Sequence, residues 1–180
     1  MEYVDIVDED NNLLGFTATR NEAHEKNLWH RHASGWIMNK KGDILLQQRA
    51  FTKKKNPGKW AKTGGHVDAG EEPIDAFKRE VFEEIGLKLD DKDIINLEIF
   101  KSSKPSEHFF SHGYLFITDK KEDEFTLQKE EVNQVKYFTI EELEELKRKD
   151  DKNYTFADWE DEGFYKQMKY LKKERNKLLS

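Results

Sequence analysis

The chain has 180 residues, no cysteine, and 31 basic against 37 acidic side chains, so its formal net charge is −6. This length suits a single domain spanning residues 1–180, and the lack of cysteine excludes a disulfide framework, a Cys-ligated metal site and a catalytic thiol. The acidic balance argues against non-specific binding to nucleic acid, and no apolar run is long enough to span a membrane. With no secretory signal visible at the N-terminus, we expect a cytoplasmic protein.

The first third of the chain shows the alternation of apolar and polar residues that predicts strands. A turn at Asp10–Asn12 suggests that the first two strands form an N-terminal hairpin, and a turn at 41–43 joins the last two. The expected elements are strands at 3–7 and 13–16, one helical turn at 21–26, and strands at 36–39 and 44–49. The segment 51–59, with three consecutive lysines, is expected to be a loop.

From Pro73 to Ile85 the apolar residues change to a helical period. Pro73 suits the first turn of a helix, and Gly86 suits the residue that ends it. The apolar stripe of this helix consists of Ile74, Phe77, Val81 and Ile85. After it we expect strands at 94–100, 114–118 and 132–138, and helices at 140–146 and 163–179. This succession predicts an α/β fold with a C-terminal helix.

The same helix carries three acidic residues on the face opposite its apolar stripe. Glu80, Glu83 and Glu84 are spaced at i, i+3 and i+4, so their carboxylates lie side by side and repel one another. Such a cluster suits Mg²⁺, which takes oxygen ligands and is commonly shared with substrate phosphates. The glycines at 64–65 let the backbone approach closely, so a carbonyl there is a further candidate ligand. Taken alone, the three acids favour the simpler interpretation, a solvated acidic helix face.

The full spacing around this helix is more specific. It resembles the Nudix box, G-x5-E-x7-R-E-U-x-E-E-x-G-U, in which U is a bulky aliphatic residue. Every fixed position of the box, residues 65–87, is occupied as required: Gly65, Glu71, Arg79, Glu80, Val81, Glu83, Glu84, Gly86 and Leu87. The resemblance implies the Nudix fold, an α/β/α sandwich around a mixed β-sheet. It also implies Mg²⁺- or Mn²⁺-dependent hydrolysis of a nucleoside diphosphate derivative, a small-molecule diphosphate, by attack of water on phosphorus.

The resemblance also implies a role for each residue of the box. Glu83 and Glu84 would bind the metal, Glu80 would be a further ligand or the base, and the backbone of Gly65 another ligand. Arg79, with Glu71, would hold the loop against the helix. Many members draw a further glutamate from a later loop, and Glu130 and Glu131 are the candidates here, with a solvated loop as the alternative. Members are commonly dimers, so the resemblance allows a homodimer.

Outside the box, the chain resembles isopentenyl-diphosphate isomerase, which shares the Nudix fold. The resemblance rests on Glu22–His24, His30, Trp36, Gln48–Ala50, Lys53, Pro57–Gly58, Trp60, Gly65–His66 and Tyr154–Trp159. The isomerase needs a cysteine where this chain has Gly64, so isomerase activity is the disfavoured alternative. A non-catalytic nucleotide-binding module is another alternative, disfavoured because all the acids of the box are present.

The isomerase resemblance suggests further binding residues. Arg49 and Lys53 match positions that hold diphosphate, and His66 lies inside the box loop, close to any substrate. His24, His30 and His66 match a three-histidine metal site, although for a hydrolase we favour ordinary polar roles for His24 and His30. A surface that stacks a base is expected to draw on some of Trp60, Phe109, Phe110, Tyr154 and Trp159, whose alternative is burial in the core.

Overall fold

The computed structural model describes residues 2–180 of the chain. In chain order its elements are β1 (Tyr3–Val7), β2 (Leu13–Thr19), α1 (Arg20–Glu25), β3 (His30–Asn39), β4 (Ile44–Arg49), β5 (Trp60–Ala61), β6 (Thr63–His66), α2 (Pro73–Ile85), β7 (Ile94–Lys104), β8 (Glu107–Thr118), β9 (Val132–Phe138), α3 (Ile140–Arg148) and α4 (Asp161–Leu179). Short 3₁₀ turns cover Asp91–Asp93, Glu122–Glu124 and Thr155–Asp158. No helix within residues 2–180 has the length and apolar character needed to cross a bilayer.

Seven of the strands form one mixed sheet in the order β5-β4-β3-β8-β7, with β6 added to β3 and β9 added to β4. The strand β3 runs through its centre. Along its whole length β3 pairs in parallel with β8, from His30 opposite Phe109 to Asn39 opposite Thr118. Its other edge is shared, because β6 pairs with its first half and β4 with its second half, both antiparallel.

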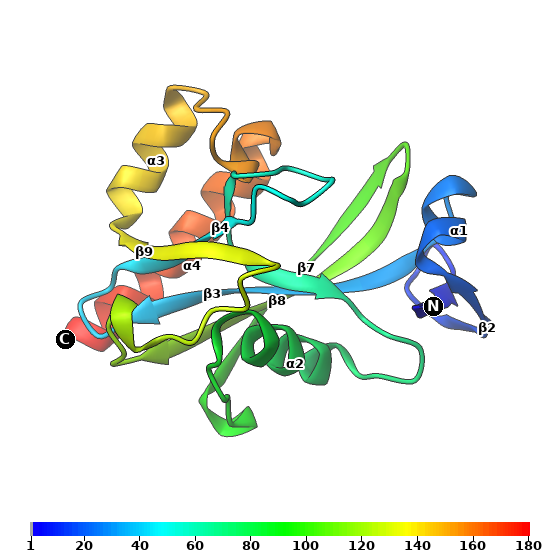
Figure 1. Cartoon of the computed structure of the whole chain (residues 1–180), viewed down its shortest axis with the longest axis horizontal. Coiled ribbons are helices and arrows are strands. Elements are labelled where there is room, and N and C mark those ends of the chain that lie inside the picture. Colours follow the sequence, from blue (N-terminus) through cyan, green and yellow to red (C-terminus); the bar gives the residue numbers. More distant parts are fainter. Residues whose placement is uncertain (1) are drawn as a thin grey trace.

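Helices cover both faces of this sheet, which confirms the expected α/β/α sandwich (Figure 1). The helix α2 packs on one face through buried Phe77, Val81 and Ile85, which meet buried side chains of β3 and β8. On the other face, α3 and α4 enclose a second cluster that contains Trp36 and Phe164. The acidic face of α2 is therefore held rigidly from behind by apolar packing.

The expected N-terminal hairpin is also present, as β1 and β2, and lies with α1 at one end of the molecule (Figure 1). This N-terminal unit has a small apolar cluster of its own. Three contacts join it to the loop before α2: the Gly70 backbone N–H donates to Asp5 at 2.7 Å, Arg20 pairs with Asp68 at 2.7 Å, and the Ala69 N–H donates to the carbonyl of Tyr3 at 2.9 Å. The N-terminal unit thereby borders the cleft in front of α2 through Glu2 and Arg20.

Several expected boundaries were wrong. The strand β3 begins at His30 instead of residue 36, β8 begins at Glu107 instead of residue 114, and the short strands β5 and β6 were not expected. These segments are rich in histidine, serine and glycine, which lack the apolar alternation that marks a strand. Pairing with neighbouring strands, rather than local preference, makes them extended.

The ends of α2 agree with the sequence. Pro73 occupies the first turn, where its missing N–H costs no hydrogen bond. Gly86 has a left-handed φ of 69° and donates its N–H to the carbonyl of Phe82. A glycine adopts this conformation without the steric cost that a side chain would add.

Candidate functional site

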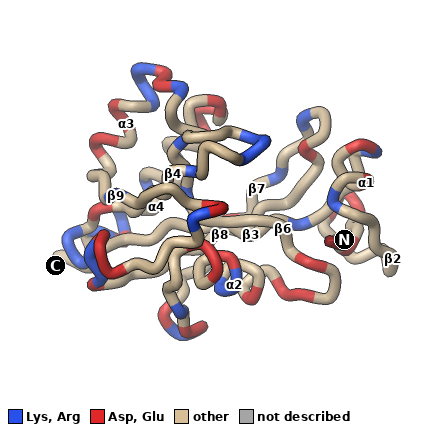
Figure 2. Tube along the Cα trace, in the orientation of Figure 1, with Lys and Arg blue, Asp and Glu red and all other residues tan. Residues whose placement is uncertain are grey.

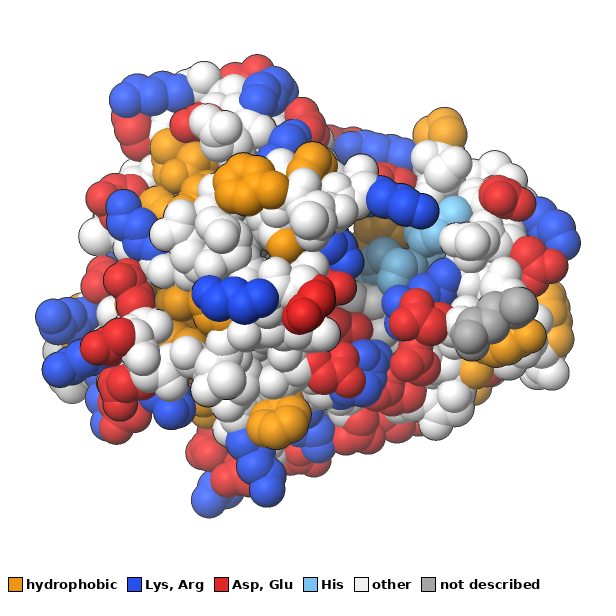
Figure 3. All heavy atoms as spheres, viewed as in Figure 1, with side chains coloured by type: hydrophobic (Ala, Val, Ile, Leu, Met, Phe, Trp, Pro, Cys, Tyr) orange, Lys and Arg blue, Asp and Glu red, His pale blue; other side chains and the backbone are white. Residues whose placement is uncertain are grey.

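A cleft of about 1230 Å³ lies in front of α2. Its walls come from the loop after β4, from β6, from the β7–β8 hairpin and from the segment that leads into α4. Figure 3 shows it as a recess lined in part by histidine, and Figure 2 shows lysines of the loop after β4 on the side opposite the acidic stretch of α2. Of the ten residues expected to form the site, eight line this cleft: Arg49, Lys53, Gly65, His66, Arg79, Glu80, Glu83 and Glu84.

Arg79 is the centre of a charged network at the floor of the cleft. Its guanidinium forms two hydrogen bonds with Glu71, both 3.0 Å long, and donates to Glu80 at 2.8 Å. It also reaches the carbonyl of His66 at 3.1 Å and Glu83 at 3.4 Å. The hydrogen bonds to Glu71 raise the pKa of Arg79 further above its ordinary value. One side chain thus fixes the box loop and two of the acids relative to each other.

Glu84 is the most deeply buried of the three acids, with 6% of its surface exposed. Gln47 donates a hydrogen bond of 2.8 Å to its carboxylate, and the carbonyl oxygen of the same amide accepts from Thr63. Burial raises the pKa of Glu84 to about 8 and also raises the pKa of Glu80.

These surroundings fit a divalent cation. Glu84 lines the cleft, and no basic side chain among residues 2–180 forms an ion pair with it, so an ion bound there would supply the missing positive charge. The Glu83 side chain is half exposed toward the cleft. A Cβ added at Gly65 would collide with the Glu80 carboxylate, so the backbone of the loop lies directly against that acid.

The basic loop after β4 faces this acidic floor. Lys53 forms an ion pair of 2.6 Å with Glu131, and Arg49 donates to the carbonyl of Lys55 at 3.1 Å. Glu131 is partly buried and lines the cleft, whereas Glu130 is exposed and lies outside the lining. Of the two candidate acids from this loop, the structure therefore brings Glu131, and not the expected Glu130, to the site.

The aromatic residues divide between the cleft and the core. Trp60, expected to bind substrate, does not line the cleft; it packs edge-to-face on Phe138 at 5.5 Å, among the apolar residues beneath α3 and α4. Tyr154 is buried in the same cluster. Phe109 of β8 and Trp159, which precedes α4, do line the cleft.

Four histidines meet at the end of the cleft nearest the N-terminal unit. They are His24 of α1, His30 and His32 of β3, and His66 of β6, and their ligand nitrogens all lie within 4.8 Å of one another. Within residues 2–180, no other group of three or more His, Asp or Glu side chains converges in this way. The structure thus joins the three histidines suggested by the sequence and adds His32.

The chemistry of this histidine cluster suits a metal ion. The Nε2 atoms of His30 and His32 are buried and have no hydrogen-bond partner among the described residues, and Nε2 of His24 and His66 are 2.9 Å apart. Burial lowers the pKa of His30 and His32, and lowers that of His66 to about 2. Neutral imidazoles, the form that binds transition metals, are therefore favoured here. The sequence signal that could have identified His32 is its position two residues after His30, since alternate residues of a strand face the same side.

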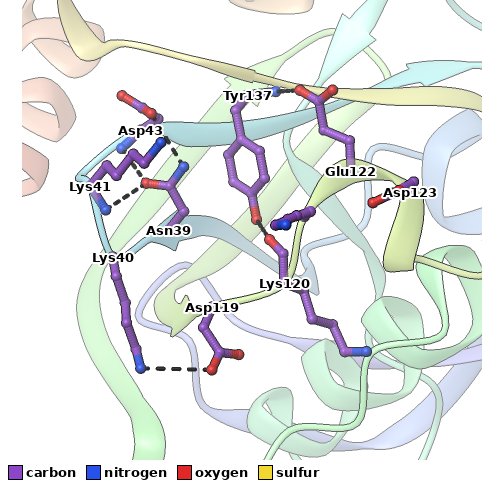
Figure 4. A pocket seen from close by; sticks show the side chains of 10 residues that line it. Asn39, Lys40, Lys41, Asp43, Asp119, Lys120, Glu122, Asp123 and Tyr137 are labelled. Atoms are coloured by element: carbon purple, nitrogen blue, oxygen red, sulfur yellow. Dashed lines mark hydrogen bonds and ion pairs between the residues drawn. The ribbon is translucent and has the colours of Figure 1, made fainter.

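A second hollow, of about 500 Å³, lies at the other end of β3, beside the turn into β4 (Figure 4). Several of the polar groups that line it already have partners. Lys40 lies 3.7 Å from Asp119, and the Tyr137 hydroxyl donates to the carbonyl of Lys120 at 2.8 Å. None of the residues expected to form the site lines this hollow.

Comparison with known proteins agrees with the geometry. The family model of the NUDIX domain matches residues 28–159. An uncharacterized Nudix hydrolase of Listeria monocytogenes is 35% identical over 148 residues, covering 82% of this chain and 85% of that relative. One of Clostridium acetobutylicum is 31% identical over 150 residues, covering 79% and 72%. An isopentenyl-diphosphate Delta-isomerase of Serratia proteamaculans is 32% identical over 124 residues, covering 67% and 68%.

Solved structures show the same fold. The crystal structure of DR0079 from Deinococcus radiodurans superposes with a TM-score of 0.66 and 22% identity, covering 79% of this chain and 86% of that one. A MutT protein from Methanosarcina mazei gives a TM-score of 0.53 and 23% identity, covering 64% and 80%. At these identities the likeness concerns the fold alone.

Proposed function

Because this chain is a hydrolase of the Nudix family, we propose that it cleaves the diphosphate linkage of a nucleoside diphosphate derivative by attack of water on phosphorus. The observation that carries the proposal is Glu84, a buried carboxylate that forms no ion pair with a basic side chain of residues 2–180 and faces a cleft whose opposite wall is basic. A divalent cation would complement the acidic side of the cleft, and a diphosphate would complement the basic side.

The residues that would hold Mg²⁺ or Mn²⁺ are Glu80, Glu83 and Glu84, with the backbone of Gly65 beside them. When bound, such an ion would neutralise charge on the diphosphate and on the leaving oxygen. Arg79 positions Glu80 and Glu83 through its hydrogen bonds, so we assign it a positioning role instead of direct contact with substrate.

Residues of the loops that face α2 would activate the water and bind the diphosphate. Glu131 is the candidate that accepts a proton from the attacking water, because it lines the cleft and its charge acts on Glu84. Arg49 and Lys53 line the same cleft and would bind the diphosphate oxygens. Lys53 pairs with Glu131 in the structure, so substrate binding would release this acid from its partner.

We also propose that the histidine cluster holds a transition metal ion as a second, separate site. Its four imidazoles suit Zn²⁺, Co²⁺ or Ni²⁺ better than Mg²⁺, which prefers oxygen ligands. The two buried nitrogens without partners support this role.

Two other functions are weaker. Isomerisation of isopentenyl diphosphate, the reaction named for the Serratia relative, would need an acid or base where the chain has Gly64, and the whole chain contains no cysteine. A purely nucleotide-binding role would leave unexplained why Arg79 and Gln47 orient the acids of α2 so closely.

The test is a panel of nucleoside diphosphate derivatives, incubated with Mg²⁺, with Mn²⁺ or with a chelator, and analysed for products. We expect phosphate-containing products that require the metal. In Glu83→Gln, turnover should fall at least ~100-fold while the melting temperature stays unchanged, because α2 is held by its other face. Asp75→Asn, an exposed acid on the same helix, is the matched control. Full activity of Glu83→Gln on every compound would contradict the proposal.

A further inference from the structure

Lys62 lies between β5 and β6 and lines the cleft on the side formed by the C-terminal segment. Its ammonium is 5.0 Å from the centre of the Trp159 ring and 5.3 Å from that of Trp36. The carbonyl oxygen of the Gln167 side chain is 3.3 Å from Nζ. The lysine thus ends in an aromatic recess, with one neutral acceptor beside it.

This ammonium has unused hydrogen-bonding capacity. It can donate three hydrogen bonds, but no carboxylate within residues 2–180 forms an ion pair with it, and Gln167 Oε1 already accepts from Trp36 Nε1 at 2.9 Å. The tryptophan rings attract a cation but offer it no acceptor. Burial lowers the pKa of Lys62 to about 7, the effect expected of a desolvated amine without a counter-ion.

Other lysines of the cleft differ in this respect. Lys53 is paired with Glu131 at 2.6 Å, and Lys55 is paired with Glu107 at 2.9 Å. Both side chains belong to the mobile type of surface cation that binds phosphate as a point charge. Lys62 instead lies against two tryptophan rings, and among the described residues only Gln167 accepts a hydrogen bond from it.

Lys62 is also connected to the acidic floor through the backbone of β6. The next residue, Thr63, donates to Gln47, which in turn donates to Glu84. The recess and the buried acid are therefore linked by side-chain hydrogen bonds, and both line the same cleft. Trp159 and Gln167, which complete the recess, come from the segment around α4 and lie outside the box.

We propose that Lys62 binds an oxyanion of the substrate other than the diphosphate itself, a phosphate or a carboxylate on the attached group, with Trp159 as the apolar wall beside it. Substrates that carry this extra anion are then preferred. This inference rests on the proposed hydrolysis of a diphosphate derivative, whose substrate class it narrows.

The experiment compares pairs of nucleoside diphosphate derivatives that differ only by an added phosphate or an added carboxylate, the two arms distinguishing the sources of the anion. In the wild-type protein we expect a higher kcat/KM for at least one anionic member. In Lys62→Met, which keeps the apolar stem, this preference should fall by ~10-fold or more, mainly through KM, since a hydrogen bond to a charged group is lost. Lys173→Met, which removes an exposed charge from α4, is the control and should retain the preference.

A second measurement does not depend on hydrolysis. The wild-type protein is treated with an acetylating reagent at pH 7, and modification of Lys62 is followed by mass spectrometry with and without non-hydrolysable methylene diphosphonate analogues of the same pairs. We expect the analogue with the added phosphate or carboxylate to protect Lys62, and the analogue without it to leave Lys62 reactive. Equal protection by both, or an unchanged preference in Lys62→Met, would overturn the inference. Protection without any hydrolysis would refute only the proposed function.

Discussion

Arg79 and Glu71 form a two-pronged ion pair, with Nε 3.0 Å from Oε1 and Nη2 3.0 Å from Oε2. The pair joins α2 to the loop that precedes it, eight residues earlier in the chain. Because the same guanidinium reaches the carbonyl of His66 and the Glu80 carboxylate, the loop and the acids are positioned together. The geometry of the site therefore depends on a side chain that need not touch the substrate.

We predict that Arg79→Lys lowers kcat at least ~10-fold and reduces the melting temperature, because lysine cannot form the planar two-pronged contact that positions both partners. The measurements are steady-state kinetics at saturating Mg²⁺ and a thermal melt. Arg148→Lys, at an exposed position near the end of α3, is the matched control. Wild-type kinetics in Arg79→Lys would show that the pair has no positioning role.

The adjacent acids Glu130 and Glu131 allow a sharp comparison. Glu131→Gln should lower kcat by ~10²-fold or more, the range expected when a general base is removed, whereas Glu130→Gln should leave kcat unchanged. Glu131→Gln also frees Lys53, so KM for the diphosphate should not rise. The opposite order of effects in the two variants would assign the base to Glu130.

The histidine cluster predicts a spectroscopic signature. Adding Co²⁺ to the protein should produce visible absorption bands typical of nitrogen ligation in a tetrahedral site, which Mg²⁺ does not displace. His32→Ala should weaken Co²⁺ binding at least ~10-fold, because one of four ligands is lost. His112→Asn, a partly buried histidine outside the cluster, should bind Co²⁺ like the wild type. Equal binding by all three proteins would exclude the site.

His112 itself predicts how stability depends on pH. Burial lowers its pKa to about 4, from 6.5 in the unfolded chain. Between these values the unfolded chain binds the proton more readily, so stability should fall as the pH drops from 6.5 to 4, and this contribution should stay constant below that range.

The check is urea unfolding of wild type and His112→Asn at several pH values in the presence of a chelator. The variant should lose part of the acid sensitivity, while the buried histidines of the cluster maintain the rest. Parallel curves for the two proteins would show that His112 is protonated equally in the folded and unfolded states.

The acidic face of α2 could be predicted from the sequence because helical spacing fixes which residues share a face. Its period placed Phe77 and Val81 in the core and Glu80 and Glu83 on the cleft side, as the structure shows. The placement of helices on both faces of the sheet was predicted from the resemblance of the box to the Nudix family.

Other parts of the site depend on long-range pairing that local sequence does not contain. The segment His30–Gly35 becomes a strand through contacts with β8 and β6, and only this extended form places His32 beside His30. The choice of Glu131 over Glu130 rests on a turn in which the Glu131 N–H donates to the carbonyl of Gln128. Trp60 was assigned to substrate by resemblance, but the short strand β5 directs it into the apolar cluster instead.

The parallel pairing of β3 with β8 has a consequence for how the protein folds. It joins His30 to Phe109, 79 positions apart (109 − 30), and every later pair of that ladder has the same separation. Closing so long a loop is entropically costly and slows the search for native contacts. The cleft therefore cannot be complete before β8 has been synthesised, whereas the backbone hydrogen bonds of α2 lie within one short segment.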